Sequence, residues 1–189
     1  MDPRVARSRA AIVDATVASV LDRGVQGASV EDICARSGVA RTTVYRHWTS
    51  QPDLVLDALS SSLRPPGDPD TGNLRTDLLE LVGSFATALS DGPLARLMAT
   101  MVEAATRDER FAEVHRREVR RRHGVLRGVL ERGVARGELP ATTDLDQVLA
   151  AVLGPVLYQA VVAMEPVPSA FVTTVVDTVL AAPTRPASP

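Results

Sequence analysis

The sequence predicts an all-α protein: a three-helix N-terminal head of the homeodomain-like, helix-turn-helix kind, then a larger C-terminal helical bundle, about nine helices in all. Three observations support this fold class. Apolar residues recur at helical spacing along most of the chain, and no stretch alternates with period two as a strand would. In addition, two short helical patterns flank a glycine at position 38.

The first of the two short helices is marked at both ends. Ser29 is a favoured N-cap residue, and Asp32 follows three positions later, which resembles a capping box. Gly38 can adopt a positive φ and end the helix. Two short helices around a glycine-containing turn form a helix-turn-helix, whose second helix binds in the major groove of DNA.

The second short helix has the chemistry that this placement requires. Val44 and Trp48, one turn apart, would face the core, and no acidic residue lies between Ile33 and Thr49 in a chain of net charge −2. The alternative is an ordinary solvated helical hairpin, which the turn glycine and the absence of acids disfavour. The exposed residues that could bind phosphates or base edges are Arg41, Thr42, Thr43, Tyr45, Arg46 and His47.

The stretch SVEDICARSGVARTTVYRHWTS, residues 29–50, resembles the N-terminal signature of the tetracycline-repressor (TetR) family, and the likeness covers roughly residues 5–63. The resemblance implies an all-helical, dimeric transcriptional regulator that binds a double-stranded DNA operator. By position, it implies base contacts from Arg41, Thr42 and Tyr45. It also implies phosphate contacts from Ser29, Thr43 and His47.

Four positions depart from the family pattern. Cys34 replaces a small alanine, which is harmless because a buried cysteine behaves as a small apolar residue. Ala40 replaces a serine and removes a side-chain cap, and Gln51 replaces a lysine and removes a charge-assisted phosphate contact. Glu31 replaces a frequent arginine; its carboxylate would repel phosphate but could accept a hydrogen bond from a cytosine amino group.

Two further helices complete the N-terminal part. A helix over residues 5–23 ends at Gly24 and closes the core, giving a DNA-binding domain of residues 1–50. Ser50, with an acid three residues later, caps a connecting helix over residues 51–64.

Charge is distributed unevenly along the chain. Residues 1–50 carry seven arginines and five acids, net +2, whereas residues 51–189 carry fourteen arginines and eighteen acids, net −4. The basic excess therefore lies where DNA would bind. Arg4, Arg7 and Arg9 are either an arm that reaches the DNA backbone or solvated charges at a frayed end.

Composition narrows the class of protein. A chain of 189 residues can bury about 70% of its unfolded surface without a disulfide or metal. The single cysteine, Cys34, excludes an internal disulfide and a multi-cysteine zinc site. No apolar run reaches membrane-spanning length and no signal peptide is recognisable, so we expect a cytoplasmic protein without cofactor or metal.

PPGDPDTGN, residues 65–73, is rich in proline and glycine and is predicted to be a linker at the domain boundary. Residues 74–182 follow as a helical body, which the resemblance makes a ligand-binding and dimerisation domain. Residues 183–189 form a tail. The expected helices before the last pair cover residues 74–90, 93–106 and 108–136.

An arginine-rich stretch, HRREVRRRH, lies within the long helix of the body. Its histidines, His115 and His123, are eight residues apart with no carboxylate at ligand spacing, so a metal site is not predicted. A solvated face is favoured over an anion site, because Glu113 and Arg117 form an i,i+4 pair.

The last two helices are almost uncharged: residues 141–182 contain only Asp144, Asp146, Glu165 and Asp177. Helices this apolar must be covered on more than one side. A second copy of the chain is the simplest cover, with a monomer that has a well-buried core as the alternative. The residues predicted at the dimer interface are Val148, Val152, Val156, Phe171, Val175 and Val179.

Gly154-Pro155 interrupts this apolar stripe, so a kink is expected there. The kink could fit the helix around its neighbours, or it could open the body to the small-molecule effector that the resemblance implies. Plain core packing is the alternative use of these apolar residues. The predicted pocket residues are Phe85, Leu97, Met98, Met101, Val102, Leu126 and Tyr158.

The leading functional hypothesis is a homodimeric, sequence-specific transcriptional regulator, in particular a repressor released from a palindromic operator by a small apolar ligand. One alternative is a helical protein-interaction adaptor with a vestigial helix-turn-helix. The other is an all-helical enzyme, which is less favoured because the sequence shows no set of nucleophile, base and acid.

Overall fold

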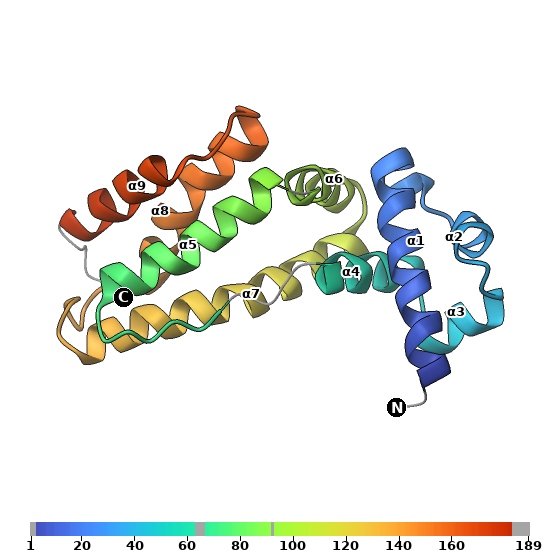
Figure 1. Ribbon diagram of the computed structural model, residues 1–189, viewed down its shortest axis with the longest axis horizontal. Helices are drawn as coiled ribbons and strands as arrows, with labels where there is room; N and C mark the ends of the chain where they lie inside the picture. Colours follow the sequence, from blue (N-terminus) through green and yellow to red (C-terminus); the bar gives the residue numbers. More distant parts are fainter. Residues whose placement is uncertain (1–2, 63–66, 92, 183–189) are drawn as a thin grey trace. The chain divides into compact units, whose positions relative to one another are not determined.

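The computed structural model describes residues 3–62, 67–91 and 93–182 (Figure 1). This part of the chain is helical and contains no strand, which confirms the predicted all-α class. The helices are α1 (Pro3–Gly27), α2 (Val30–Ser37), α3 (Arg41–His47), α4 (Gln51–Ser62), α5 (Leu74–Asp91), α6 (Leu94–Arg107), α7 (Glu109–Ala135), α8 (Leu145–Leu157) and α9 (Ser169–Ala181). A π-helical turn, η1 (Tyr158–Val162), follows α8. The predicted tail, residues 183–189, lies outside the described residues.

The chain divides into two compact units. Unit 1 comprises Met1–Arg64 and Arg96–Glu118, and unit 2 comprises Pro65–Ala95 and Val119–Pro189. The sequence led us to expect that residues 74–182 form one body. The structure instead groups most of α6 and the start of α7 with the N-terminal helices, because α6 shares a core with α1 and α4.

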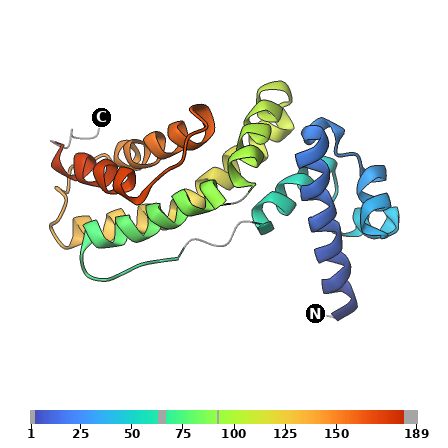
Figure 2. The same cartoon turned by 45° about the horizontal axis from the view of Figure 1, so that its top comes forward.

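The helix-turn-helix core lies within unit 1, where α2 and α3 lie on one side of α1 and α4 lies on the other (Figures 1 and 2). Apolar side chains from all four helices meet there. They are Ile12, Val13, Ala15, Val30, Ile33, Val44, Trp48, Leu54 and Ala58. Burying a large apolar side chain contributes about 1.5–3 kcal/mol, so this cluster fixes the three short helices relative to α1.

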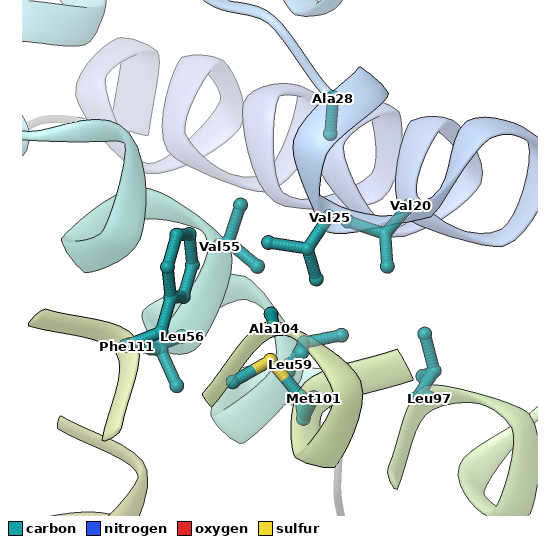
Figure 3. Packing of buried hydrophobic residues seen from close by; sticks show 10 residues of the cluster. All are labelled: Val20, Val25, Ala28, Val55, Leu56, Leu59, Leu97, Met101, Ala104 and Phe111. Carbon is teal, nitrogen blue, oxygen red and sulfur yellow. The ribbon is translucent and has the colours of Figure 1, made fainter. Parts of the chain in front are cut away.

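A second core cluster joins the later part of α1 to α4, α6 and the start of α7 (Figure 3). Leu97 and Met101, predicted to line a ligand pocket, are 3% and 5% exposed and point into this cluster (Figure 3). These two side chains are therefore core residues of unit 1, which was the plainer of the two interpretations of their spacing.

Gly24 ends the regular part of α1, as predicted from its position. Its φ of 72° lies in the left-handed region that glycine tolerates, so the helix is kinked at Gly24 before it continues to Gly27.

The predicted linker is described from residue 67 onward, and these residues are attached firmly within unit 2. Nη2 of Arg132 donates to Oδ1 of Asp68 at 2.7 Å and to the carbonyl of Pro69 at 2.8 Å. Nη1 of Arg136 donates to Asp70 at 3.3 Å. Residues 67–73 therefore belong to unit 2, which begins at residue 65 where the sequence placed the domain boundary, and arginines more than fifty residues away bind their carboxylates.

Asp77 lies at the centre of this attachment and is fully buried. Its Oδ1 accepts hydrogen bonds from the Thr71 backbone N–H at 2.8 Å and the Thr71 hydroxyl at 2.7 Å, and its Oδ2 accepts from Nη2 of Arg136 at 3.4 Å. Burial alone would raise the pKa of Asp77, but the bonds from Thr71 and the charge of Arg136 leave that pKa lowered. Asp77 is thus an ionised carboxylate that fixes the loop to Arg136, the residue directly after α7.

Helix α8 packs against α5 and α9 within unit 2 (Figure 1). The segment Leu145–Val162 is long and apolar enough to cross a membrane by length and composition alone. The expectation that no apolar run reaches membrane-spanning length was therefore wrong for this segment. Val148, Val152 and Val156 are buried inside the unit, but only 22% of the segment is buried, so one face forms core and the other positions are half-buried or exposed. Regular α-helix continues through Pro155, and the irregularity expected at Gly154-Pro155 lies just beyond it, in the π-helical turn η1.

Candidate nucleic-acid interface

Helix α2 begins and ends as the sequence predicted. The hydroxyl of Ser29 accepts a hydrogen bond from the backbone N–H of Asp32 at 3.1 Å, which satisfies one of the unpaired donors of the first turn. At the other end Gly38 has a φ of 69°, and its N–H donates to the carbonyl of Cys34. These two local signals place the turn that leads into α3.

Asp32 also attaches α2 to α1. Its Oδ2 accepts a hydrogen bond from the Ser19 hydroxyl at 2.6 Å and one from Nε of Arg36 at 2.8 Å. The Ser19 bond is the largest reason that the pKa of Asp32 is lowered, and the arginines add to it. The carboxylate is thus held in its ionised form between the two helices.

Helix α3 buries one face and exposes the other. Val44 is buried, as is Trp48 directly after the helix, and both belong to the helix-turn-helix core. Ala40 precedes α3 without a side-chain cap, as its sequence predicts. On the outer face Arg41, Thr42, Tyr45 and Arg46 are exposed, whereas Thr43 and His47 are half-buried at its edges.

Arg41 does not extend freely into solvent. Its Nη1 lies 2.5 Å from Oε1 of Glu31, and its Nη2 donates to the hydroxyl of Tyr45 at 3.2 Å. The Cζ atom of Arg41 lies 5.4 Å from the centroid of the Tyr45 ring, within cation–π range. The hydrogen bond that Arg41 donates to the Tyr45 hydroxyl and the charge of Glu31 raise the pKa of Arg41. Two of the three predicted base-contacting residues therefore contact each other.

Gln51 has a role that sequence reasoning missed. Its Nε2 donates to the carbonyls of Val25 and Ala28 at 3.1 Å and 2.9 Å, where the chain leaves α1. The amide therefore satisfies backbone acceptors between the first and second helices. The lysine that the family often has at this position suggested only a lost phosphate contact. The sequence around residue 51 gives no sign that its side chain reaches residues 25 and 28.

Helix α4 has a reciprocal cap at its start. The hydroxyls of Thr49 and Ser50 each donate to Oδ2 of Asp53 at 2.7 Å, and the Asp53 N–H donates to the Ser50 hydroxyl. These hydroxyl bonds lower the pKa of Asp53, with Thr49 the largest cause. The predicted Ser50 cap is thereby confirmed, and it fixes the chain immediately after α3.

The predicted pocket residues do not come together in one unit. Leu97, Met98, Met101 and Val102 belong to unit 1, whereas Phe85, Leu126 and Tyr158 belong to unit 2. Val102 is exposed and Tyr158 is 62% exposed, while Leu126 is buried. The sequence spacing identified the apolar faces of four helices but could not show that they serve different cores.

The predicted dimer-interface residues lie mostly on the inner face of their helices. Val148, Val152, Val156 and Val175 are buried within unit 2. Phe171 and Val179 are only half-buried. These four valines contribute to the core of unit 2, where α5, α8 and α9 pack against one another.

The arginine-rich stretch of α7 forms an ion pair with the first turn of the same helix. Nη2 of Arg116 donates to Oε1 of Glu109 at 2.6 Å. Burial lowers the pKa of both His115 and His123. Within the described part of the chain, no three His, Cys, Asp or Glu side chains are arranged to hold a metal ion.

An exposed, acid-free helix is thus presented by a capped partner helix across a left-handed glycine turn, which defines a helix-turn-helix DNA-binding protein. Residues 12–58 match the family of bacterial regulatory proteins of the tetR kind, and residues 68–179 match the tetracyclin repressor-like C-terminal domain. The chain belongs to the TetR family and is a DNA-binding transcriptional regulator.

Characterised relatives are similar in sequence to this chain over most of its length. It is 30% identical over 189 residues to the DNA-binding transcriptional repressor TetR of Mycobacteroides abscessus, covering 95% of each. It is 33% identical over 145 residues to the HTH-type transcriptional regulator AqdR of Rhodococcus erythropolis, covering 75% of this chain and 68% of AqdR.

Solved structures share the fold. The crystal structure of the TetR family regulator SCO0332 has a TM-score of 0.72 at 28% identity, covering 92% of this chain and 96% of that one. FadR from Bacillus subtilis, solved in complex with stearoyl-CoA, has a TM-score of 0.69 at 14% identity, covering 91% and 97%.

Proposed function

We propose that the chain is a cytoplasmic repressor that binds a palindromic operator as a homodimer and leaves it when a small apolar ligand binds. The observation that carries the proposal is the outer face of α3, which is exposed and free of acidic residues while Val44 and Trp48 hold the helix to the core. Neither an adaptor role nor turnover of a substrate is needed to account for such a face.

Contacts to DNA divide into two kinds in this proposal. Arg41, Thr42 and Tyr45 contact base edges and supply sequence preference. Phosphate contacts supply affinity that falls as salt rises, because each one releases condensed counterions. The phosphate-binding residues in this proposal are Ser29, Thr43, Arg46 and His47. Ser29 can still donate its hydroxyl proton, since the hydroxyl only accepts a bond as the N-cap of α2.

The homodimer is proposed to form through the outer face of α8, η1 and α9. Small residues, Ala150, Ala151 and Gly154, are exposed along α8 and would let a second helix approach closely. Tyr158, Val162 and Met164 are 62%, 64% and 84% exposed, an unusual display of large apolar side chains. A dimer covers this face and presents two copies of α3 to two half-sites.

The effector is proposed to be apolar and to bind within unit 2, beside Phe85 and Leu126 of the predicted pocket. The relation to FadR, which was solved with stearoyl-CoA, makes acyl compounds a reasonable first group to test. An effector can shift the protein away from DNA only if it binds the DNA-free state more tightly than the DNA-bound state.

The direct experiment is footprinting of the purified chain on the DNA that flanks its own gene, with and without fatty acids and acyl thioesters. A protected inverted repeat that is lost when one of these compounds is added supports the proposal. Protection that no tested compound changes removes apolar acyl ligands as effectors. The absence of any protected site contradicts operator binding at that locus.

A further inference from the structure

The three residues Glu31, Arg41 and Tyr45 form a connected polar group on the outer surface of the helix-turn-helix. Glu31 lies at the start of α2 and Arg41 is the first residue of α3, so residues ten apart in sequence meet across the turn. The Glu31 and Arg41 side chains are 63% and 59% exposed. Tyr45, one turn after Arg41, contacts its guanidinium through both hydroxyl and ring.

Stability does not explain this group. An ion pair this exposed contributes little, because water and salt screen it and two long side chains lose rotamer freedom. An arginine in the first turn of a helix is also disfavoured by the helix dipole, whose positive end lies there. The pair therefore adds little to stability, and its remaining hydrogen-bonding atoms are available to a ligand.

The free hydrogen-bonding atoms of the pair have a definite pattern. A guanidinium has five N–H groups, of which Arg41 uses one on Glu31 and one on Tyr45, leaving three as donors. The Glu31 carboxylate uses Oε1 and leaves Oε2 as an acceptor. The pair thus offers donors directly beside an acceptor.

In the major groove, a G·C base pair offers the complementary pattern. Guanine presents two acceptors, N7 and O6, and the paired cytosine presents one donor, its 4-amino group. An A·T pair has its only major-groove donor on the purine, between two acceptors, and a thymine methyl at the pyrimidine edge. G·C is therefore the base pair whose adjacent acceptors and outer donor match the donors of Arg41 and the acceptor of Glu31.

We propose that Glu31 and Arg41 read one G·C base pair as a unit, Arg41 donating to guanine and Glu31 accepting from the cytosine amino group, while Tyr45 holds the guanidinium in place. This inference rests on the proposed role of α3 in base contact. It makes Glu31, on the helix that precedes α3, a residue that determines specificity. Without Arg41 beside it, the same carboxylate would only repel the phosphates.

The test begins with selection of bound duplexes from a randomised DNA library by the full-length wild-type chain. Affinities for the selected duplex are then measured by fluorescence anisotropy at fixed salt. At each G·C pair of the half-site, guanine is replaced by 7-deazaguanine, which lacks N7, or cytosine by 2-pyrimidinone, which lacks the amino group. Each duplex is measured with the wild-type chain, Glu31→Gln and Tyr45→Phe.

One position should respond to both base analogues. With the wild-type chain, each analogue there should lower affinity by roughly 5- to 150-fold, the discrimination expected of a good base contact. Glu31→Gln keeps one acceptor oxygen but loses the charge of the carboxylate, so it should bind the natural duplex less well and lose part of its sensitivity to 2-pyrimidinone at that position. Tyr45→Phe should weaken the 7-deazaguanine effect, because the Tyr45 hydroxyl no longer orients Arg41.

Glu109→Gln is the matched control, because it removes one carboxylate from a similarly exposed arginine pair on α7. It should leave the response to both analogues unchanged. If Glu31→Gln strengthens binding to all duplexes equally, Glu31 acts only as a repulsive charge and the inference is wrong, although operator binding stands. If the library yields no selected duplex, the proposed function itself fails.

Discussion

The indole nitrogen of Trp48 donates a hydrogen bond of 2.8 Å to Oδ2 of Asp57, and the same oxygen accepts a bond of 2.6 Å from Nη2 of Arg9. One carboxylate oxygen thereby joins the end of α3 to α4 and to α1. The guanidinium of Arg9 also lies over the Trp48 ring, with Cζ 5.9 Å from the centroid. Arg9 was expected to be either part of an arm that reaches the DNA backbone or a solvated charge. In the structure its guanidinium instead forms an ion pair with Asp57 within unit 1.

Asp57→Ala should destabilise unit 1, because it leaves the Trp48 N–H without its partner and Arg9 without its counter-charge. The expected loss is about 1–2 kcal/mol, since the group is partly exposed. Trp48 is the sole tryptophan of the chain, so denaturant unfolding followed by its fluorescence reports on this core directly.

The control for this substitution is Asp177→Ala, which removes the exposed ion pair with Arg75 in unit 2. It should change the Trp48 transition by less than about 0.5 kcal/mol. An equal effect of both substitutions would mean that general charge, and not the bond from Trp48, sets the stability of unit 1.

Gly38→Ala should lower stability by about 1 kcal/mol. Space is not the reason, since a Cβ there would meet no atom within 4 Å; the cost comes from the left-handed φ of 69°. Gly83→Ala is the contrast, because Gly83 lies in α5 with equally open surroundings and an ordinary helical φ. Alanine should stabilise α5 by about 0.5–1 kcal/mol. Thermal unfolding by circular dichroism would compare the two, and a loss of stability in both variants would contradict the conformational explanation.

The local part of this fold could be predicted from sequence, and the reason is physical. The N-cap at Ser29 and the turn at Gly38 depend on atoms within a few residues of each other, so their residue types are informative by themselves. The contacts of Gln51 and the attachment of Asp68 by Arg132 join residues far apart in the chain, and no local pattern encodes them.

The sequence also could not show which residues of α8 face the core, and here the reason is different. A helix that is apolar nearly all round has no polar face to mark its outer side, so the spacing of Val148, Val152 and Val156 was equally compatible with core and interface. The exposed face of α3 was easier to predict, because the polar residues around Val44 and Trp48 mark the side of the helix that faces solvent.

Asp77 should make the stability of unit 2 depend on pH in the acid range. Its pKa is lowered in the folded state, so its ionised form contributes stability that is complete above its unfolded pKa of about 3.9. This contribution is lost as pH falls through the lowered folded pKa. Asp77→Asn should therefore cost about 1–2 kcal/mol at pH 7, with the difference from wild type shrinking as the pH is lowered below 4. A difference that is constant from pH 7 to pH 3 would show that the Asp77 charge is not responsible.

Ala151→Glu and Val152→Ala separate the two faces of α8. Ala151 is exposed and Val152 is fully buried. If the proposed dimer uses the outer face, Ala151→Glu places a charge in the interface and should give monomers by size-exclusion chromatography with light scattering. Val152→Ala should keep the wild-type oligomeric state and lose about 2 kcal/mol of stability through a core cavity. The reverse outcome would place the interface on the valine stripe that the sequence first suggested.

The most direct test of the central claim compares Arg41→Ala with the wild-type chain on two duplexes, one selected from a random library and one of scrambled sequence. If the outer face of α3 reads bases, Arg41→Ala should weaken binding to the selected duplex by roughly 5- to 150-fold and binding to the scrambled duplex by much less. Equal losses on both duplexes would show that Arg41 contributes only charge, and would contradict base recognition by this residue.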